Sequence, residues 1–268
     1  MEFKKDTVAG TMVFTITLCL LCSFMITGTA GILKERKVAK KRDEVQRYVL
    51  MAADVDLGQG NEFREIFAKS VQPLLINLDT GNVDSDANVL DFDERMAAIN
   101  PETSSTPKKD IAKIKTRAND ARVFKVLDTN GKLTSVVVPF YGKGLWSMIY
   151  GYVAVEPDFN TIKGLVVYEH GETPGIGDFV TDPHWLSLWK GKQLFDEKGK
   201  FSIRLVKGGA KEGDVHGVDA VSGATMTGRG VQRAMEFWFG VEGFQTFFNQ
   251  LKASATQGEL QGELGEAK

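Results

Sequence analysis

The chain has 268 residues, with 33 Lys and Arg against 35 Asp and Glu, and a formal net charge of −2. This balance gives no indication of a nucleic-acid partner, because a nucleic-acid-binding domain normally carries a basic face. The two cysteines, Cys19 and Cys22, both lie in an apolar N-terminal stretch, so the remainder can form no disulfide or thiolate metal site and must be held by packing.

After a short segment, residues 1–6, the stretch 7–33 contains no charged residue. A membrane-spanning helix needs about 20 apolar residues, whereas the apolar part of a cleaved signal peptide has about 7 to 15. We therefore expect a retained transmembrane helix, with cleavage near residues 27–31 as the alternative. Cys19 and Cys22 share one face of this helix. We expect them to pack against another helix, and a metal or redox pair shared with a neighbouring subunit is the alternative.

A cluster of basic residues follows the span and fits the surface of an anionic membrane. Only Lys4 and Lys5 precede the span. By the positive-inside rule, this asymmetry places the soluble domain in the cytoplasm. The cluster consists of Lys34, Arg36, Lys37, Lys40, Lys41 and Arg42.

Residues 34–120 are predicted to form a juxtamembrane helix and a small membrane-proximal lobe. Apolar residues at three- and four-residue spacing predict that the first helix continues or restarts over 43–53. A short helix is expected over 61–68 and a strand over 71–78. The polar segment 100–120 indicates a linker or an exposed helix.

Residues 121–252 are predicted to form a second domain that begins with hairpins. Strands at 123–127 and 133–140 flank Asn130-Gly131, a pair typical of a type I′ turn. A second pair of strands is expected at 150–156 and 162–168.

Helices and one further strand follow these hairpins. Asp182 and Pro183 are typical of the first residues of a short helix. A strand is predicted over 201–206, and an amphipathic helix over 228–239. Hairpins followed by helices favour an α+β fold, with a mostly antiparallel sheet and packed helices behind one N-terminal transmembrane helix. The acidic tail, 253–268, is expected to be disordered.

The most informative motif runs from Asp219 to Thr227, Asp-Ala-Val-Ser-Gly-Ala-Thr-Met-Thr. Its hydroxyls flank Gly223 and Ala224, so another enzyme's active site can close over the backbone and reach one hydroxyl. The stretch resembles the Ser-Gly-Ala-Thr motif of the FMN-binding domain family. In that family the last threonine, here Thr225, carries FMN through a phosphoester that a separate flavin transferase makes from FAD.

Two glycine-rich segments and the single N-terminal helix extend the resemblance over nearly the whole chain. The segments are Tyr141-Gly-Lys-Gly-Leu-Trp146 and Glu172-Thr-Pro-Gly-Ile-Gly177. With the acceptor motif they make the chain similar to the C subunits of sodium-translocating NADH:quinone reductases. The related G subunits of Rnf complexes, which couple ferredoxin and NAD, are the alternative, and a flavin-free membrane-tethered sensory or scaffolding domain is another.

The resemblance implies an electron-carrying subunit of a bacterial inner-membrane complex, with covalent FMN and no independent catalytic or metal site. Its implied partners are the other subunits of the complex, the flavin transferase during maturation, and the lipid bilayer. It also places the flavin domain in the periplasm, opposite to the side that the Lys and Arg count predicts.

The expected flavin contacts come from the acceptor segment, the two glycine-rich segments and two single residues. Thr225 is the attachment residue, with Ser222 and Thr227 as fallback acceptors, and Gly223 and Ala224 complete the acceptor segment. Lys207 and His216 are candidate cations near the flavin. The two glycine-rich segments are expected to supply Tyr141, Gly144, Leu145, Trp146, Glu172, Thr173, Gly175 and Ile176.

Overall fold

The computed structural model describes residues 7–84 and 88–254 and divides into two units, Met1–Glu44 and Val45–Lys268. Helix α1, Val8–Ala52, passes through both as one uninterrupted helix, so the predicted membrane helix continues and does not restart. The expected disorder of the tail lies mostly outside the described residues, and residues 245–254 are helical.

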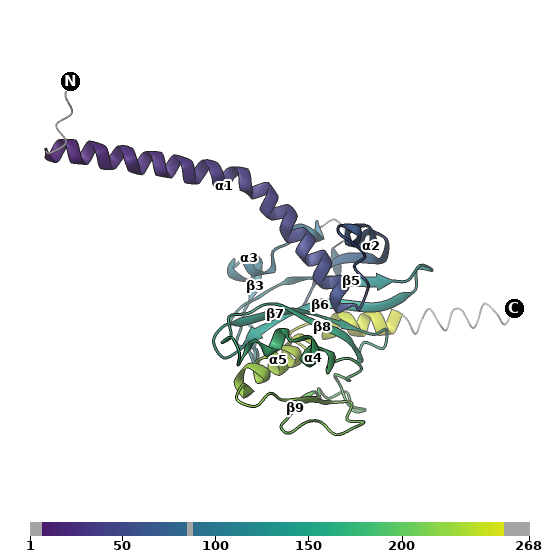
Figure 1. Cartoon of the computed structure of the whole chain (residues 1–268). Coiled ribbons are helices and arrows are strands. Elements are labelled where there is room, and N and C mark those ends of the chain that lie inside the picture. The colour runs from purple at the N-terminus through teal and green to yellow at the C-terminus, as the bar shows by residue number, and fades with distance from the viewer. Residues whose placement is uncertain (1–6, 85–87, 255–268) are drawn as a thin grey trace. The chain divides into compact units, whose positions relative to one another are not determined.

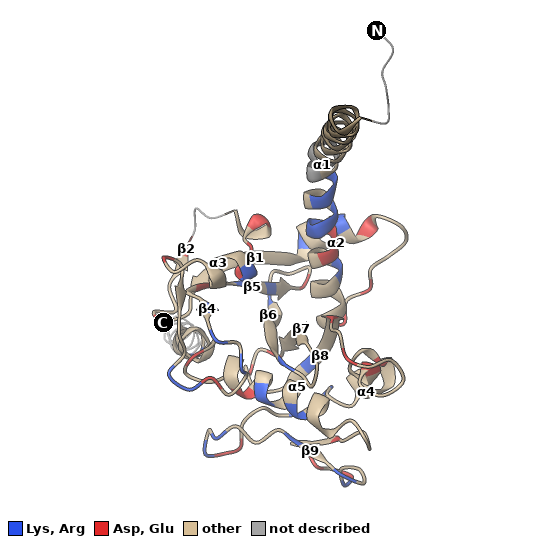
Figure 2. Cartoon of the chain, turned by 90° about the vertical axis from the view of Figure 1, so that its left-hand side faces the viewer, with Lys and Arg blue, Asp and Glu red and all other residues tan. Residues whose placement is uncertain are grey.

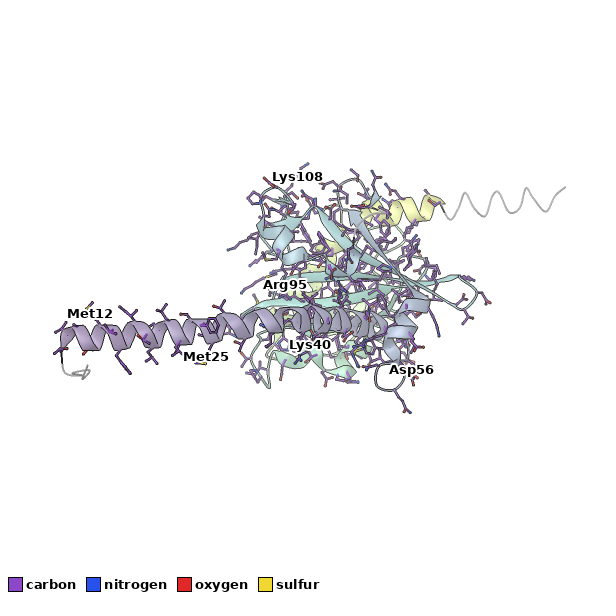
Figure 3. All side chains as sticks on the ribbon, turned by 90° about the horizontal axis from the view of Figure 1, so that it is seen from above. Met12, Met25, Lys40, Asp56, Arg95 and Lys108 are labelled. Carbon is purple, nitrogen blue, oxygen red and sulfur yellow. The ribbon has the colours of Figure 1, made fainter. Side chains whose placement is uncertain are left out.

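In the first unit, Val8–Thr29 is a candidate membrane span, with a mean hydropathy of 2.1 and none of it buried. Figure 3 shows Met12 and Met25 projecting from this bare helix. The hydroxyls of Thr11 and Thr15 donate to carbonyls one turn earlier, at 3.2 and 2.9 Å, so these polar groups are satisfied within the helix.

The basic cluster follows on the same helix and appears as blue bands in Figure 2. Arg36, Lys37, Lys40, Lys41 and Arg42 are all exposed. An exposed basic stripe next to an apolar span is suited to the headgroup region of a membrane.

The second unit is built on a six-stranded sheet in the order β2-β1-β5-β6-β7-β8, in which every neighbouring pair is antiparallel. This topology confirms the predicted α+β class. The strands are β1 Val71–Asn77, β2 Val83–Asp84, β5 Asp120–Leu127, β6 Leu133–Lys143, β7 Met148–Val155 and β8 Ile162–Glu169.

Both faces of the sheet are covered by helices or helical residues. Side chains alternate between the two faces along each strand, so one strand contributes to both core clusters. In β6, Val136, Val138 and Phe140 join the larger core cluster with residues of α5, Thr225–Trp238. Val137 points the other way, into a smaller cluster with α2, Glu62–Ser70, and residues 45–53. Figure 1 shows α5 and α4, Pro183–Ser187, on the side of the sheet opposite α2.

The segment before residue 120 belongs to this same sheet, since β1 pairs with β5 along its whole length. The segment 100–120 is neither an exposed helix nor an open linker. It forms a small hairpin of β3, Ser104–Ser105, and β4, Arg117–Ala118, whose second strand is buried. The polar composition of the segment does not indicate this burial. Arg117 can be buried because its guanidinium is paired with Asp79.

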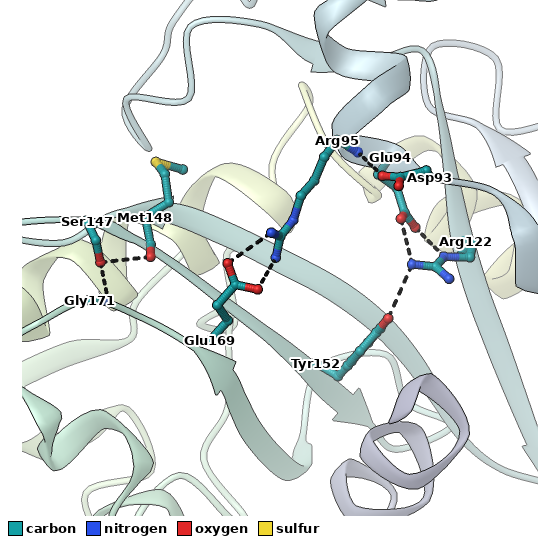
Figure 4. Close-up of polar contacts among 9 residues, drawn as sticks. All are labelled: Asp93, Glu94, Arg95, Arg122, Ser147, Met148, Tyr152, Glu169 and Gly171. Atoms are coloured by element: carbon teal, nitrogen blue, oxygen red, sulfur yellow. Dashed lines mark hydrogen bonds and ion pairs between the residues drawn. The ribbon is translucent and has the colours of Figure 1, made fainter. Parts of the chain in front are cut away.

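Helix α3, Glu94–Ile99, is fastened to the sheet by two ion pairs (Figure 4). Glu94 accepts two hydrogen bonds of 2.6 Å from Arg122, and Arg95 donates to Glu169 at 2.9 and 2.7 Å. A 3₁₀ turn, η1 at Val89–Asp91, precedes this helix.

The β5–β6 connection differs from the predicted type I′ turn, in which both central residues have positive φ. Here only Gly131 does, at +79°. The carboxylate of Asp128 accepts from the amides of Asn130 and Lys132 at 2.8 and 2.9 Å. This side-chain contact favours a longer turn with a single left-handed glycine.

The connection from β8 to α5 contains the 3₁₀ turn η2, Asp178–Thr181, and α4, which Asp182 caps as predicted. The strand predicted over 201–206 is shorter, β9 at Arg204–Val206, and it pairs in parallel with β10, Gly217–Asp219. Phe201 instead forms an isolated bridge with Phe195.

Candidate functional site

Helix α5 is seated directly on the backbone of β6, because small residues face each other at the contact. A Cβ built on Gly230 would lie 2.6 Å from the carbonyl oxygen of Lys143, and one on Gly142 would lie 2.8 Å from the Cβ of Ala234. Gly142 therefore leaves room for the helix. This close seating fixes the first turn of α5, where the acceptor motif ends.

Thr225 is the first residue of α5, and it is partly exposed. The N-cap is Ala224, which has no side chain able to cap, so the hydroxyls of the motif do not cap this helix. Gly223, with φ of +82°, forms the turn that leads into it.

Thr225 lies between two surface hollows. We call the first the Trp146 hollow; it has a volume of about 140 Å³, and its exposed apolar members include Trp146, Ile176 and Met226. It is lined by Leu145, Trp146, Glu172, Thr173, Ile176, Gly177, Gly223, Ala224, Thr225, Met226 and Thr227.

We call the second the Lys207 hollow; it is smaller, with a volume of about 50 Å³, and carries the cations Lys207 and Arg229. It is lined by Leu205, Lys207, Ala220, Val221, Ala224, Thr225, Gly228, Arg229 and Gln232. Thr225 thus has an apolar, partly aromatic hollow on one side and a basic one on the other.

Glu172 connects the loop before β7 to the first turn of α5. Its carboxylate accepts from the amides of Leu145, Trp146 and Ser147 at 3.1, 3.0 and 3.1 Å, and from the hydroxyl of Thr227 at 2.5 Å. Burial of this group opposes its ionisation, but the hydrogen bonds from Thr227 and the three amides outweigh burial and lower the pKa of Glu172.

These contacts occupy the backbone donors of the loop 145–147. The amides of residues 145–147 face the carboxylate of Glu172, so they are already paired and are not open to a ligand. Gly144 provides the necessary room, since a Cβ there would lie 2.6 Å from Oε1 of Glu172.

Nine of the predicted residues line the Trp146 hollow together: Leu145, Trp146, Glu172, Thr173, Ile176, Gly223, Ala224, Thr225 and Thr227. Lys207 is near Thr225 but lines only the second hollow. Gly177 and Met226 were not predicted. Both adjoin predicted residues, but only their folded positions place them in the hollow.

Five predicted residues line neither hollow: Tyr141, Gly144, Gly175, His216 and Ser222. Tyr141 stacks against Tyr150 and packs on Trp238, with ring centroids 5.6 and 4.6 Å apart.

The other four lie in turns and loops outside the two hollows. Nδ1 of His216 lies 2.7 Å from the carbonyl oxygen of Gln193. Gly175, with φ of +75°, forms the turn in which the amide of Gly177 donates to the carbonyl of Thr173 at 2.8 Å. Ser222 is exposed in the turn before α5, and Gly144 lies beside Glu172.

Comparison with known proteins gives consistent results. The FMN-binding domain family matches residues 144–240, which include both hollows' loops and all of α5. The C subunit of the Na(+)-translocating NADH-quinone reductase of Haemophilus ducreyi is 39% identical over 256 residues, 95% of this chain and 98% of its own length. The Vibrio alginolyticus protein of the same name is also 39% identical, over 97% of this chain and 100% of its own length.

Solved structures agree with these relatives. The crystal structure of Shewanella oneidensis NqrC is 93% identical, with a TM-score of 0.79, and the match covers 80% of this chain and 99% of that one. The corresponding protein from Parabacteroides distasonis is 25% identical, with a TM-score of 0.61 over 80% of this chain and 94% of its own. The chain therefore belongs to the family of C subunits of Na(+)-translocating NADH-quinone reductases, and it is a subunit of an oxidoreductase complex with an FMN-binding domain.

Proposed function

We propose that this chain carries FMN on Thr225 through a phosphoester and relays electrons within a sodium-pumping NADH:quinone reductase. The observation that carries the proposal is the position of Thr225, on the first turn of α5 and on the wall of both hollows. NADH and quinone bind to other subunits in this proposal.

The residues around Thr225 suit the parts of FMN. The Trp146 hollow offers apolar and aromatic side chains that can cover a planar ring system, with Thr173 as a polar partner at its wall. The first amides of α5 have no acceptor within the helix and favour an anion, and Lys207 and Arg229 add positive charge. Bound there, FMN would supply a carrier that accepts and donates electrons singly or in pairs.

The neighbouring hydroxyls are less suited to attachment. Thr227 is 1% exposed and donates its hydroxyl to Glu172, whereas Thr225 is partly exposed. Residues two apart on an α-helix point in directions about 200° apart, so one threonine can face the surface while the other faces the interior. This difference supports Thr225 over Thr227 as the acceptor.

Attachment is a phosphoryl transfer catalysed by a separate flavin transferase. The Oγ–P bond to the FMN phosphate forms as the phosphoanhydride bond of FAD breaks, AMP leaves, and the hydroxyl proton passes to the transferase. The chain contributes the nucleophilic hydroxyl and an accessible turn, in which Gly223 and Ala224 add little bulk.

The test is the mass of the purified full chain co-expressed with the flavin transferase, together with its fluorescence on a denaturing gel. We expect the mass increment of FMN and a fluorescent band for the native chain and for Ser222→Ala and Thr227→Val. Thr225→Ala should lack both. A native chain without FMN would refute the redox role, and an increment that persists in Thr225→Ala would refute the acceptor assignment.

We further propose that Val8–Thr29 anchors the chain in the bacterial inner membrane with the flavin domain in the periplasm. A carrier tethered by a covalent bond suits that compartment, where dissociated FMN could not be replaced. The basic cluster then lies at the periplasmic surface, against the positive-inside rule. Alkaline phosphatase fused after residue 254 should be active in intact cells, and an inactive but intact fusion would place the domain in the cytoplasm.

A further inference from the structure

The residue Glu172 is 4% exposed, and its carboxylate accepts four hydrogen bonds from groups of this chain. Oε1 accepts from the amides of Trp146 and Ser147, and Oε2 accepts from the amide of Leu145 and the hydroxyl of Thr227. A carboxylate with this number of donors has little capacity left for a ligand. Although it lines the Trp146 hollow, Glu172 is therefore not placed to bind a cofactor directly.

The four donors come from two segments that are far apart in the sequence. One is the loop 145–147, which presents Leu145 and Trp146 to the hollow, and the other is the first turn of α5 with Thr225. Gly177 allows the approach, because a Cβ there would lie 2.8 Å from the Cβ of Glu172. A single buried charge thus joins the wall of the hollow to the helix that carries the acceptor.

The loop is fixed further by its own contacts. The amide of Gly144 donates to the carbonyl of Ser147 at 2.8 Å, and the hydroxyl of Ser147 accepts from the amide of Gly171 at 2.6 Å (Figure 4). Lys143 donates to the carbonyl of Trp146 at 2.6 Å. The loop is therefore ordered by contacts within the chain, with Glu172 at its centre.

We propose that Glu172 is a positioning residue that sets the geometry of the Trp146 hollow relative to Thr225 before any flavin is attached. The inference rests on the proposed attachment of FMN at Thr225, but it assigns Glu172 no contact with the flavin. Its physical basis is preorganisation: a wall already held in place costs less to order when the ring docks.

Three variants of the full chain separate the effect of the negative charge of Glu172 from the effect of its hydrogen bond to Thr227 on α5. Glu172→Ala removes all four contacts. Glu172→Gln can keep Oε1 on the amides of Trp146 and Ser147 and donate its NH₂ group to Thr227, so only the amide of Leu145 loses its acceptor. Thr227→Val keeps the charge and the three amide contacts but cuts the connection to α5.

Glu94→Gln is the matched control. Glu94 is also a largely buried carboxylate held by two short hydrogen bonds, from Arg122, but it lies on α3 and lines neither hollow. It should lower stability without changing the hollow.

The first measurement is hydrogen exchange at the amides of residues 145–147 in a Thr225→Ala background, where no FMN is attached in the proposal. We expect Glu172→Ala to speed exchange there at least about tenfold, and Glu94→Gln and Thr227→Val to change it less than about threefold. Unchanged exchange in Glu172→Ala would overturn the proposal, and so would equal acceleration in Glu94→Gln.

The second measurement is the visible circular dichroism of FMN on chains with native Thr225, which reports how firmly the ring is held. Glu172→Ala and Thr227→Val should lose more than half of the signal, whereas Glu172→Gln should recover most of it. A native signal in Glu172→Ala would refute the positioning role. If the native chain carries no FMN at all, the proposed function fails, while the exchange measurement still decides the role of Glu172.

Discussion

The seating of α5 on β6 can be tested by exchanging one methyl group across the contact between Gly142 and Ala234. A Cβ added at Gly142 would lie 2.8 Å from the Cβ of Ala234 and 3.4 Å from both the Cα of Ala234 and the carbonyl oxygen of Ala112. Only the first distance is well short of an ordinary contact. Removing the methyl group of Ala234 should therefore make room for one at Gly142.

The two single variants destabilise the fold for different reasons. Gly142→Ala overpacks the contact, at a cost of about 2 kcal/mol. Ala234→Gly loses about 1 kcal/mol of helix propensity and about 0.8 kcal/mol from one buried methyl group, since Ala234 is 1% exposed. If the two changes were independent, the unfolding free energy of the double variant would fall by about 4 kcal/mol. Relief of the overlap should reduce this loss to about 2 kcal/mol.

The assay is urea unfolding of the full chain in detergent, followed by the fluorescence of the buried Trp185, Trp189 and Trp238. In thermal unfolding followed by the same fluorescence, Gly142→Ala alone should lower the melting temperature by about 4 to 8 °C. This range follows because 1 kcal/mol corresponds to about 2 to 4 °C for a domain of this size. The decisive quantity is the coupling energy. Free-energy changes that simply add in the double variant would refute this account of the packing.

Two further predictions concern the same region. The folded pKa of Glu172 is lowered, so its hydrogen bonds stabilise the fold above the unfolded pKa of about 4.3, and that stability is lost as pH falls through the lower, folded value. The difference in unfolding free energy between the native chain and Glu172→Gln should therefore be constant from about pH 6 to 8 and shrink below about pH 4; a difference that grows on acidification would contradict the assignment. Gly230→Ala should destabilise the chain by about 2 kcal/mol in urea unfolding despite its better helix propensity, since its Cβ would meet the carbonyl oxygen of Lys143 at 2.6 Å. A gain in stability would show that α5 can move away from β6 at little cost.

Elements with a strong local signal were predictable. The hairpin formed by β7 and β8 follows two runs of β-branched and aromatic residues, and the N-cap Asp182 followed by Pro183 marks the start of α4. The candidate membrane span could be recognised from the length of its uncharged stretch alone.

Elements that depend on distant partners were not predictable in this way. The three residues of β10 become a strand only because β9 lies alongside them. Arg117 sits in a polar segment, and its burial follows from pairing with Asp79. No local pattern distinguishes such residues from an exposed linker.

The candidate site shows the same division. The Ser-Gly-Ala-Thr stretch that ends at Thr225 and the two glycine-rich segments were visible in the sequence. The role of each residue within these segments was not visible in the sequence. Gly144 lies against Glu172, whereas Tyr141, from the same segment as Gly144, packs on Trp238. Residue type predicts which loops gather at a site, whereas the direction of each side chain depends on the packed helix beneath it.

The two threonines at the start of α5 show how the fold would decide which hydroxyl is open to the proposed attachment. Residues two apart on a helix differ in direction by about 200°, and here Thr225 is partly exposed on the wall of both hollows while Thr227 is buried with its hydroxyl on Glu172. The helix can hold this orientation only if it cannot rotate, and Gly230 against the carbonyl of Lys143 leaves it little freedom to do so. In the proposed attachment, the accessible hydroxyl of Thr225 thus depends on the hydrogen bond that holds Thr227 to the buried Glu172.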